Sequence, residues 1–280
     1  MKAMSRAFSF TGSTTIVSGA SSGLGAIFAR TLAPRAETLI LVARSGEALE
    51  TLAQELRDTS PELNVFTVTA DLASEEGRSR LWDRISQEKL APNALINNAG
   101  LGDYGLFATS EASRISQQID VNITALTLLT HRFLNSIQAG SAGRPAVVLN
   151  VSSIAGETPL PDLAVYAASK AYVTSLSEAL AIELAGTKVR VLAVCPGPTP
   201  TNFGNTARRK GASDIDRTGQ NFLEIPPERV VCEAIRAAEG GKYRHFPGKR
   251  VAAAALGFRC VPRVLRHALL QRRFRKGNMP

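Results

Sequence analysis

Tyr166 and Lys170 are the pair of side chains in this chain best suited to proton transfer. They stand four residues apart, so in a helix they lie on one face. A nearby ammonium favours the ionised form of a phenol, and we therefore expect Lys170 to lower the pKa of Tyr166. Such a phenol can protonate a carbonyl oxygen, or deprotonate an alcohol, near neutral pH. Ser153 offers a hydroxyl that can hold the same oxygen.

A glycine-rich turn supplies a second chemical signal. Residues 18–25 read SGASSGLG, follow a short apolar run and precede a helical segment. Glycines allow a tight turn and a close backbone approach, and the N-terminus of the next helix offers unpaired N–H groups to a pyrophosphate. The turn therefore predicts a dinucleotide site, although taken alone it could be a turn that only packs.

The elements that must position these residues alternate regularly along the chain. Apolar runs suited to buried strands lie at 14–18, 38–43, 64–69, 94–97, 146–151 and 189–194. Helical segments are expected near 24–33, 46–57, 75–88, 111–137 and 164–185. The alternation predicts an α/β fold, a doubly wound parallel sheet of Rossmann type with helices on both faces. Trp82 and Phe133 are expected to be packing residues.

We expect one catalytic domain over 1–249 and a basic, amphipathic helical extension over 250–280. Residues 197–226 are rich in Gly, Pro, Asn and Thr, which predicts a long loop that covers a site. The 280 residues contain no apolar run of the roughly 18 to 20 residues that a membrane span needs, and MKAMSRAFSF is unlike a secretory signal. The sequence therefore predicts a cytoplasmic protein.

Metal chemistry is disfavoured. The cysteines Cys195, Cys232 and Cys260 are widely separated, so neither a disulfide framework nor a thiolate metal site is expected. The three histidines of the chain stand alone, without a second ligand four residues away. No metal site is predicted, and a zinc-dependent dehydrogenase is disfavoured.

The glycine spacing GxxxGxG resembles that of the short-chain dehydrogenase/reductase family and differs from the GxGxxG of other dinucleotide folds. Further motifs follow in the order of that family, across roughly residues 14 to 201: Asp71-Leu72, the NNAG of residues 97–100, Asn122, Ser153, Tyr166 and Lys170 as YxxxK, and Pro196-Gly197. Ser18 stands where the family usually has Thr, and both carry a hydroxyl. The joint occurrence is far more specific than any single motif.

The resemblance implies a role for each matching residue. Asn122, Ser153, Tyr166 and Lys170 would be catalytic, with Asn122 positioning a water that links Lys170 to solvent. Lys170 would also hold the nicotinamide ribose, and Ser153 is preferred over Ser152 because of its distance from Tyr166 in sequence. The positions expected at the cofactor are Gly19, Ser21, Ser22, Gly23, Leu24, Gly25, Asp71, Leu72, Asn98, Ala99, Gly100, Tyr166, Lys170, Pro196, Gly197, Thr199 and Thr201.

Arg44 bears on the choice of cofactor. Enzymes of this fold that use NAD commonly place an acidic side chain after the second strand, whereas the 2′-phosphate of NADP needs positive charge there. This chain has Arg44 followed by Ser45, and a guanidinium can hold a phosphate by two charge-assisted hydrogen bonds. NADP (NADPH) is therefore predicted over NAD.

The tail is strongly basic, with 11 Lys/Arg and no Asp/Glu in residues 240–280. Residues 250–276 predict one or two helices around Pro262, with apolar residues at helical spacing. Such a helix could lie on an anionic membrane surface or pack its apolar side on the domain, and both alternatives stay open. Nucleic-acid binding is disfavoured because aromatic residues are not interleaved with the basic ones.

A small-molecule carbonyl or alcohol is the expected substrate, and the residues predicted to line its pocket are largely apolar. They are Leu101, Tyr104, Leu106, Phe107, Leu160, Phe203 and Phe222. The family resemblance also implies a homodimer or homotetramer, formed by the helices that carry Asn122 and Tyr166. Two other functions remain as alternatives: a catalytically silent NADP-binding regulator, and a peripheral membrane protein that acts through its basic tail.

Overall fold

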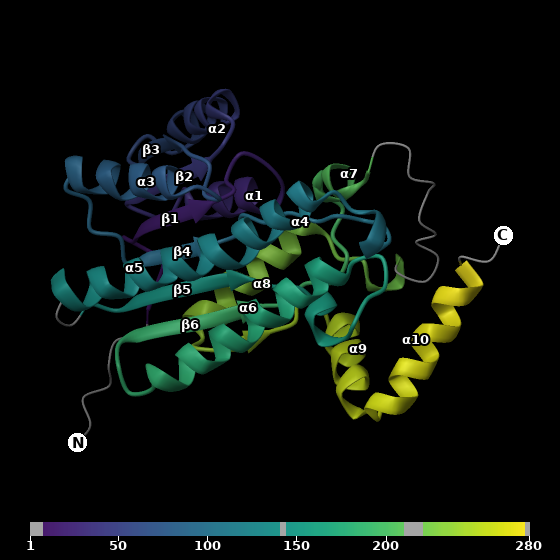
Figure 1. Cartoon of the computed structure of the whole chain (residues 1–280). Coiled ribbons are helices and arrows are strands. Elements are labelled where there is room, and N and C mark those ends of the chain that lie inside the picture. Colours follow the sequence, from purple (N-terminus) through teal and green to yellow (C-terminus); the bar gives the residue numbers. More distant parts are fainter. Residues whose placement is uncertain (1–7, 141–143, 210–220, 278–280) are drawn as a thin grey trace, which may run out of the picture.

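Seven parallel strands form one sheet at the centre of the molecule (Figure 1). The computed structural model describes residues 8–140, 144–209 and 221–277. In spatial order β3-β2-β1-β4-β5-β6-β7, the sheet contains every strand predicted from the apolar runs. The seventh strand has only two residues, too few to give a sequence pattern. The strands are β1 (Thr14–Ser18), β2 (Thr38–Ala43), β3 (Asn64–Thr69), β4 (Ala94–Asn97), β5 (Ala146–Val151), β6 (Val189–Val194) and β7 (Arg244–His245).

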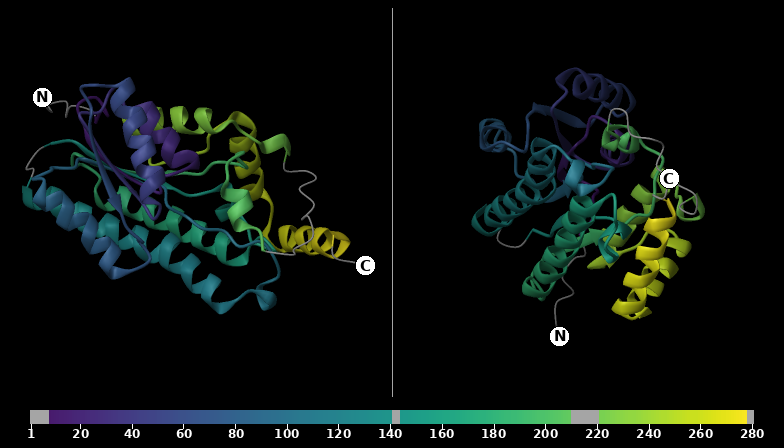
Figure 2. Two further views of the ribbon diagram at one scale, coloured as in Figure 1. Left: turned by 90° about the horizontal axis from the view of Figure 1, so that it is seen from above. Right: turned by 45° about the vertical axis from the view of Figure 1, so that its right-hand side comes forward.

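Helices cover both faces of this sheet, as the predicted doubly wound architecture requires (Figure 2). One face packs against α1 (Gly23–Leu32), α2 (Gly46–Thr59) and α8 (Pro227–Glu239). The other packs against α3 (Glu75–Gln87), α5 (Leu126–Gly140) and α6 (Ala164–Glu183).

Neighbouring residues of a strand point to opposite faces, so each strand contributes to both cores. In β1, Val17 joins the core under α1 and α8, while Ile16 joins the core under α3 and α5. In β2, Leu41 and Ile40 divide in the same way. Strands buried on both faces explain why these segments read as continuous apolar runs.

Serine side chains begin two of the helices. Ser45 accepts a hydrogen bond from the Ala48 amide at the start of α2, and Ser74 accepts one from the Gly77 amide at the start of α3. Each bond satisfies an amide that the first turn of a helix leaves without an internal partner. At the start of α1, Ser22 makes no such side-chain bond.

The segment predicted as a helix over 111–137 is helical but not uniform. It consists of α4 (Ala112–Ile119), a π-helical turn η2 (Asp120–Ala125) and α5. The extra residue of a π turn shifts the helix face that follows it, and π turns are frequent at functional sites. Asn122 lies inside this turn, which periodicity alone could not reveal.

The segment predicted as a loop over 197–226 contains two short helices where the structure describes it, α7 (Phe203–Ala207) and the 3₁₀ turn η4 (Asn221–Leu223). Its residues 210–220 lie outside the described residues. Two further 3₁₀ turns follow β4 and β5 along the chain: η1 (Phe107–Thr109) and η3 (Ile154–Glu157).

Two helices form the basic tail, α9 (Lys249–Cys260) and α10 (Arg263–Gly277), with Pro262 between them as predicted. Val251 and Ala255 of α9 are buried against Ile154 and Leu223, so α9 packs on the segment that follows Ser153. None of the described helices is long and apolar enough to cross a bilayer.

Phe133 provides a test of the core between α5 and the sheet, because its side chain is completely buried. We expect Phe133→Ala to lower the free energy of unfolding by about 3–5 kcal/mol, since it removes a buried ring and leaves a cavity. Phe107→Ala is the matched control, because Phe107 is 60% exposed. Urea unfolding followed by circular dichroism measures both variants, and equal losses of stability would contradict the packing described.

Candidate functional site

The predicted cofactor turn meets the end of β4 at the carboxyl edge of the sheet. Between β1 and β4 the strand order reverses direction, and ligands of open α/β sheets bind at such a point. A Cβ atom on Gly19 would lie 2.9 Å from the Ala99 Cα, and one on Gly25 would lie 2.1 Å from the Gly19 carbonyl oxygen. Both positions therefore require glycine, and Gly19 also has a positive φ of 65°.

Ser18 and Asn98 fasten these two loops together. The Ser18 hydroxyl accepts hydrogen bonds from the amides of Asn98 and Ala99, at 3.0 and 3.1 Å. The Asn98 side-chain amide donates to the carbonyls of Ser18 and Gly19, at 3.0 and 3.1 Å. Ser18 makes these contacts through its hydroxyl, a group that threonine also has. Serine can therefore replace the threonine that the family usually has at this position.

The donor set at this turn fits the phosphates of a dinucleotide. The first turn of α1 contains no acidic residue and its Ser22 cap makes no side-chain bond, so backbone N–H groups are free to bind an anion. Thr201 faces the same turn, because a Cβ on Gly23 would lie 3.6 Å from the Thr201 Cβ. Ser21 lies partly exposed in the turn, and Leu24 packs on the core beneath it.

The other residues predicted at the cofactor lie at the same edge of the sheet. Arg44, directly after β2, is exposed, and no side-chain partner is recorded for it in the described part of the chain. After β3, Leu72 is buried and Asp71 accepts a bond from the Ala73 amide at 3.1 Å. After β6, the Pro196 carbonyl accepts from the Ile154 amide at 2.9 Å, and Thr199 donates to the Gly197 carbonyl at 3.0 Å.

Tyr166 and Ser153 come together although they are 13 positions apart in sequence. Ser153 ends the segment after β5, and Tyr166 lies in the first turn of α6. Burial raises the pKa of Tyr166 to about 12, and a hydrogen bond with Ser153 opposes that rise. The phenol is therefore protonated at neutral pH, the form that can donate a proton.

Lys170 is buried beside this tyrosine. Its Nζ lies 5.6 Å from the centre of the Tyr166 ring and donates to the Val151 carbonyl at 2.8 Å. Burial lowers the pKa of Lys170 to about 8. The sequence predicts that Lys170 lowers the pKa of Tyr166, but burial acts more strongly and the pKa of Tyr166 rises.

Asn122 is held in the π turn by the loop after β4. Its side-chain oxygen accepts from the Leu101 amide at 2.8 Å, and its amide donates to the Leu101 carbonyl at 2.9 Å and to Ser169 at 3.0 Å. A Cβ on Gly100 would lie 3.5 Å from both the Asn122 oxygen and the Lys170 Nζ. All four residues predicted to be catalytic thus lie around the end of β4 and the start of α6.

Ser152, the neighbouring serine, has a different environment. Its hydroxyl donates to the Lys170 carbonyl at 2.8 Å and lies 2.7 Å from the Thr174 hydroxyl. These contacts tie the end of β5 to α6. Ser152 supports the helix, whereas Ser153 contacts Tyr166.

Comparisons with known proteins decide the family. The short chain dehydrogenase family profile matches residues 13–212 of this chain. The chain belongs to the short-chain dehydrogenase/reductase family. It is therefore an NAD(P)-dependent oxidoreductase that acts on a carbonyl or alcohol, with a nucleotide cofactor and a small-molecule substrate.

Similar members of the short-chain dehydrogenase/reductase family differ in substrate and cofactor. Sulfoacetaldehyde reductase 2 of Chromohalobacter salexigens is 35% identical over 71% of this chain and 78% of its own. A short-chain dehydrogenase from Sphingobium yanoikuyae in complex with NADPH is 30% identical, with a TM-score of 0.74 over 92% of this chain and 95% of its own. A 3-ketoacyl-(acyl-carrier-protein) reductase from Brucella melitensis, complexed with NADH, is 28% identical, with a TM-score of 0.71 over 84% and 96%.

Asp103 and Arg209 form a clasp across the site that the sequence analysis missed. The Arg209 guanidinium binds both Asp103 oxygens, at 3.0 and 2.7 Å, and also the Leu106 carbonyl and Thr109 hydroxyl. Arg114 adds a contact of 3.0 Å to the Asp103 carboxylate. The partners Asp103 and Arg209 lie 106 residues apart, so no local pattern indicates the pair.

The clasp holds α7 over Tyr166. Phe203 of α7 lies with its ring centre 5.4 Å from that of Tyr166. A Cβ on Gly102 would lie 2.8 Å from the Phe203 ring, so the loop after β4 makes room for the phenyl group. The Tyr104 amide donates to the Ala207 carbonyl at 2.9 Å. The loop after β4 and the start of the long loop after β6 are thus bound to each other beside Tyr166.

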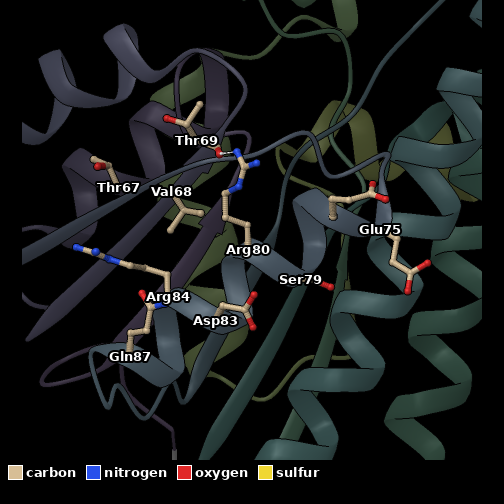
Figure 3. A pocket seen from close by; sticks show the side chains of 10 residues that line it. Thr67, Val68, Thr69, Glu75, Ser79, Arg80, Asp83, Arg84 and Gln87 are labelled. Atoms are coloured by element: carbon tan, nitrogen blue, oxygen red, sulfur yellow. Dashed lines mark hydrogen bonds between the residues drawn. The ribbon is translucent and has the colours of Figure 1, made fainter.

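A hollow of about 910 Å³ lies away from these residues, between β3 and α3 (Figure 3). Its lining is mainly polar, and Arg80 within it donates to the Thr69 carbonyl at 3.1 Å. None of the predicted catalytic residues lines it. We therefore do not place the reaction there.

The clasp yields a prediction. Arg209→Ala should raise the KM for a carbonyl substrate about tenfold, because a charge-assisted pair of this kind contributes roughly 1.5 kcal/mol or more and the pair orders the cover over the substrate. The kcat and the affinity for NADPH should change little. Arg114→Ala is the control, since Arg114 binds Asp103 without a recorded contact to the α7 segment. Equal effects of the two substitutions on KM would exclude the clasp as a positioning device.

Proposed function

We propose that the protein transfers a hydride between NADPH or NADP and the carbonyl or alcohol carbon of an apolar substrate, with Tyr166 as acid/base. The observation that carries this proposal is the position of Tyr166 beside the buried Lys170, whose Nζ lies 5.6 Å from the centre of the phenol ring, with Ser153 close enough to act on the pKa of the phenol. The bound nicotinamide supplies or accepts the hydride. The side chains supply the proton and hold the reacting oxygen.

In the reductive direction, the Tyr166 hydroxyl donates its proton to the carbonyl oxygen while Ser153 donates a hydrogen bond to the same oxygen. A phenol whose pKa is raised to about 12 is in the required protonated form. Lys170 holds the ribose hydroxyls and, as an ammonium, opposes the effect of burial on Tyr166 when the alcohol is oxidised. Asn122 positions a water that returns the proton through Lys170.

The choice of NADP rests on Arg44. Its guanidinium follows β2, where the adenosine ribose lies in this fold, and no side-chain partner is recorded for it among the described residues. A free guanidinium suits a 2′-phosphate, which accepts two charge-assisted hydrogen bonds. NAD has no 2′-phosphate, so it cannot make these charged hydrogen bonds to Arg44.

An apolar substrate is supported by the aromatic side chains beside Tyr166. Phe203 contacts its ring, and Tyr104 is close enough to raise its pKa further. Leu106, at 47% exposed, and Phe107 lie on the same loop as Tyr104. Loss of NADPH absorbance across a panel of apolar ketones and aldehydes tests this assignment directly, and activity restricted to charged carbonyls would contradict it.

We further propose a cytoplasmic homodimer or homotetramer. Apolar side chains are exposed on the outer faces of α5 and α6: Leu128, Tyr172 and Ile182, the last at 76% exposure. Burying such residues against a second copy is favourable, and paired helices make a self-complementary interface. A catalytically silent regulator is the second candidate, but nothing in the arrangement of the catalytic side chains favours it.

Arg44 gives the cofactor prediction. Wild-type protein should bind NADPH more tightly than NADH, and Arg44→Ala should narrow that gap by about 10- to 100-fold, the value of one strong charged hydrogen-bonding group. Lys89→Ala, which removes an exposed positive charge after α3, should leave the gap unchanged. Fluorescence titration of each variant with NADPH and with NADH measures the two affinities. Equal affinities of the wild-type protein for NADPH and NADH would contradict the role of Arg44 in binding the 2′-phosphate.

A further inference from the structure

α10 exposes apolar side chains that a helix of a folded domain normally buries. Val264 is 84% exposed, and Leu265 and Leu269 are each 53% exposed. Leu265 and Leu269 are four residues apart and therefore share one side of the helix, with Val264 next to them around the helix. The side of α10 nearer the body holds Arg266 and Leu270, which are partly buried. The alternative that the apolar side packs on the domain is therefore not realised by these residues.

The same helix pair has an unbalanced positive charge. Residues 249–277 include nine Lys/Arg and no Asp/Glu. Arg259 and Arg266 bind Glu157, through its carboxylate at 3.1 Å and its carbonyl at 3.2 Å. No carboxylate within the described residues is recorded as a partner of Arg263 or Arg272.

The pair is fixed at the same edge of the sheet as the active site. α9 follows β7, and the carboxyl ends of parallel strands lie together, so α9 starts from the edge that also carries the start of α6. α10 continues from the far end of α9 (Figures 1 and 2). Glu157, which binds Arg259 and Arg244, is four residues after Ser153. Its side chain is only 6% exposed, so the anchor between the tail and the catalytic segment is itself buried.

We propose that α10 docks on an anionic lipid surface, with Val264, Leu265 and Leu269 in the interface and the arginines at the headgroups. An apolar surface next to unpaired cations is the combination that such a surface binds, because the apolar side chains leave water while the cations meet lipid phosphates and carboxylates. The α10 of a second copy is a poorer partner, since it would bring the same positive charge to the contact.

Docking by α10 would bring the opening of the active site close to the membrane. An apolar substrate dissolved in lipid would then reach Tyr166 without crossing water. That consequence rests on the proposed function, whereas the docking itself does not. An experiment that measures vesicle binding and not enzyme activity therefore tests the docking independently of the proposed function.

The test is co-sedimentation of the full chain with phosphatidylcholine vesicles, prepared with and without phosphatidylserine. Wild-type protein should bind only the anionic vesicles, and less at high salt, because added ions screen the attraction. Arg263→Glu with Arg272→Glu should weaken binding at least about 25-fold, since each cation near an anionic surface contributes roughly fivefold. Leu265→Ser with Leu269→Ser should weaken it at least about tenfold through loss of apolar burial.

Lys89→Glu with Lys242→Glu is the matched control. It makes the same change of charge at the opposite edge of the sheet, after α3 and α8, and should leave vesicle binding unchanged. Circular dichroism shows that each variant keeps its fold.

The proposal is overturned if the wild-type protein does not bind anionic vesicles, or if the Lys89/Lys242 control loses as much binding as the α10 variants. It is also overturned if the Arg263/Arg272 variant loses binding but the Leu265/Leu269 variant does not. Self-association that the Leu265/Leu269 variant abolishes, without lipid binding, would instead assign α10 to a second copy.

Discussion

The close contact between the turn after β1 and the loop after β4 is the constraint on which the site depends. Gly19 and Gly25 allow the backbones to approach to distances at which any side chain would collide. Ser18 and Asn98 then fix that approach with four hydrogen bonds. Because the strands are parallel and in register, the ends of β5 and β6 lie beside these loops. Ser153 and α6 come directly after β5 in the chain, so they are held at the same place.

Burial controls the acidity of Tyr166 and Lys170. Tyr166 and Lys170 are both pushed toward their neutral forms, the phenol with its pKa raised to about 12 and the ammonium with its pKa lowered to about 8. This state suits proton donation, the step needed for reduction. The Asp103–Arg209 clasp holds α7 in place, and Phe203 of α7 packs its ring beside the phenol of Tyr166.

Sequence patterns predicted the regular part of this structure because that part obeys periodic rules. Buried strands read as apolar runs, and Tyr166 and Lys170 share a helix face at a spacing of four. The π turn around Asn122 has no such signature, since it is defined by hydrogen bonds rather than by polarity. The clasp joins two loops remote in sequence, and the direction of the Tyr166 pKa shift depends on burial, which a sequence does not display. The exposure of Leu265 and Leu269 was likewise visible only once α10 had a place beside α9.

Tyr166→Phe tests the central claim most directly, because it removes the transferable proton and keeps the ring. With NADPH prebound, the single-turnover rate on a carbonyl that the wild type reduces should fall about 10² to 10⁴-fold, while NADPH affinity stays nearly unchanged. Tyr172→Phe on the same helix is the control, since its hydroxyl bonds Thr127 on α5 at 3.0 Å and should not matter for the chemical step. A Tyr166→Phe variant that reacts at the wild-type rate would show that another group transfers the proton.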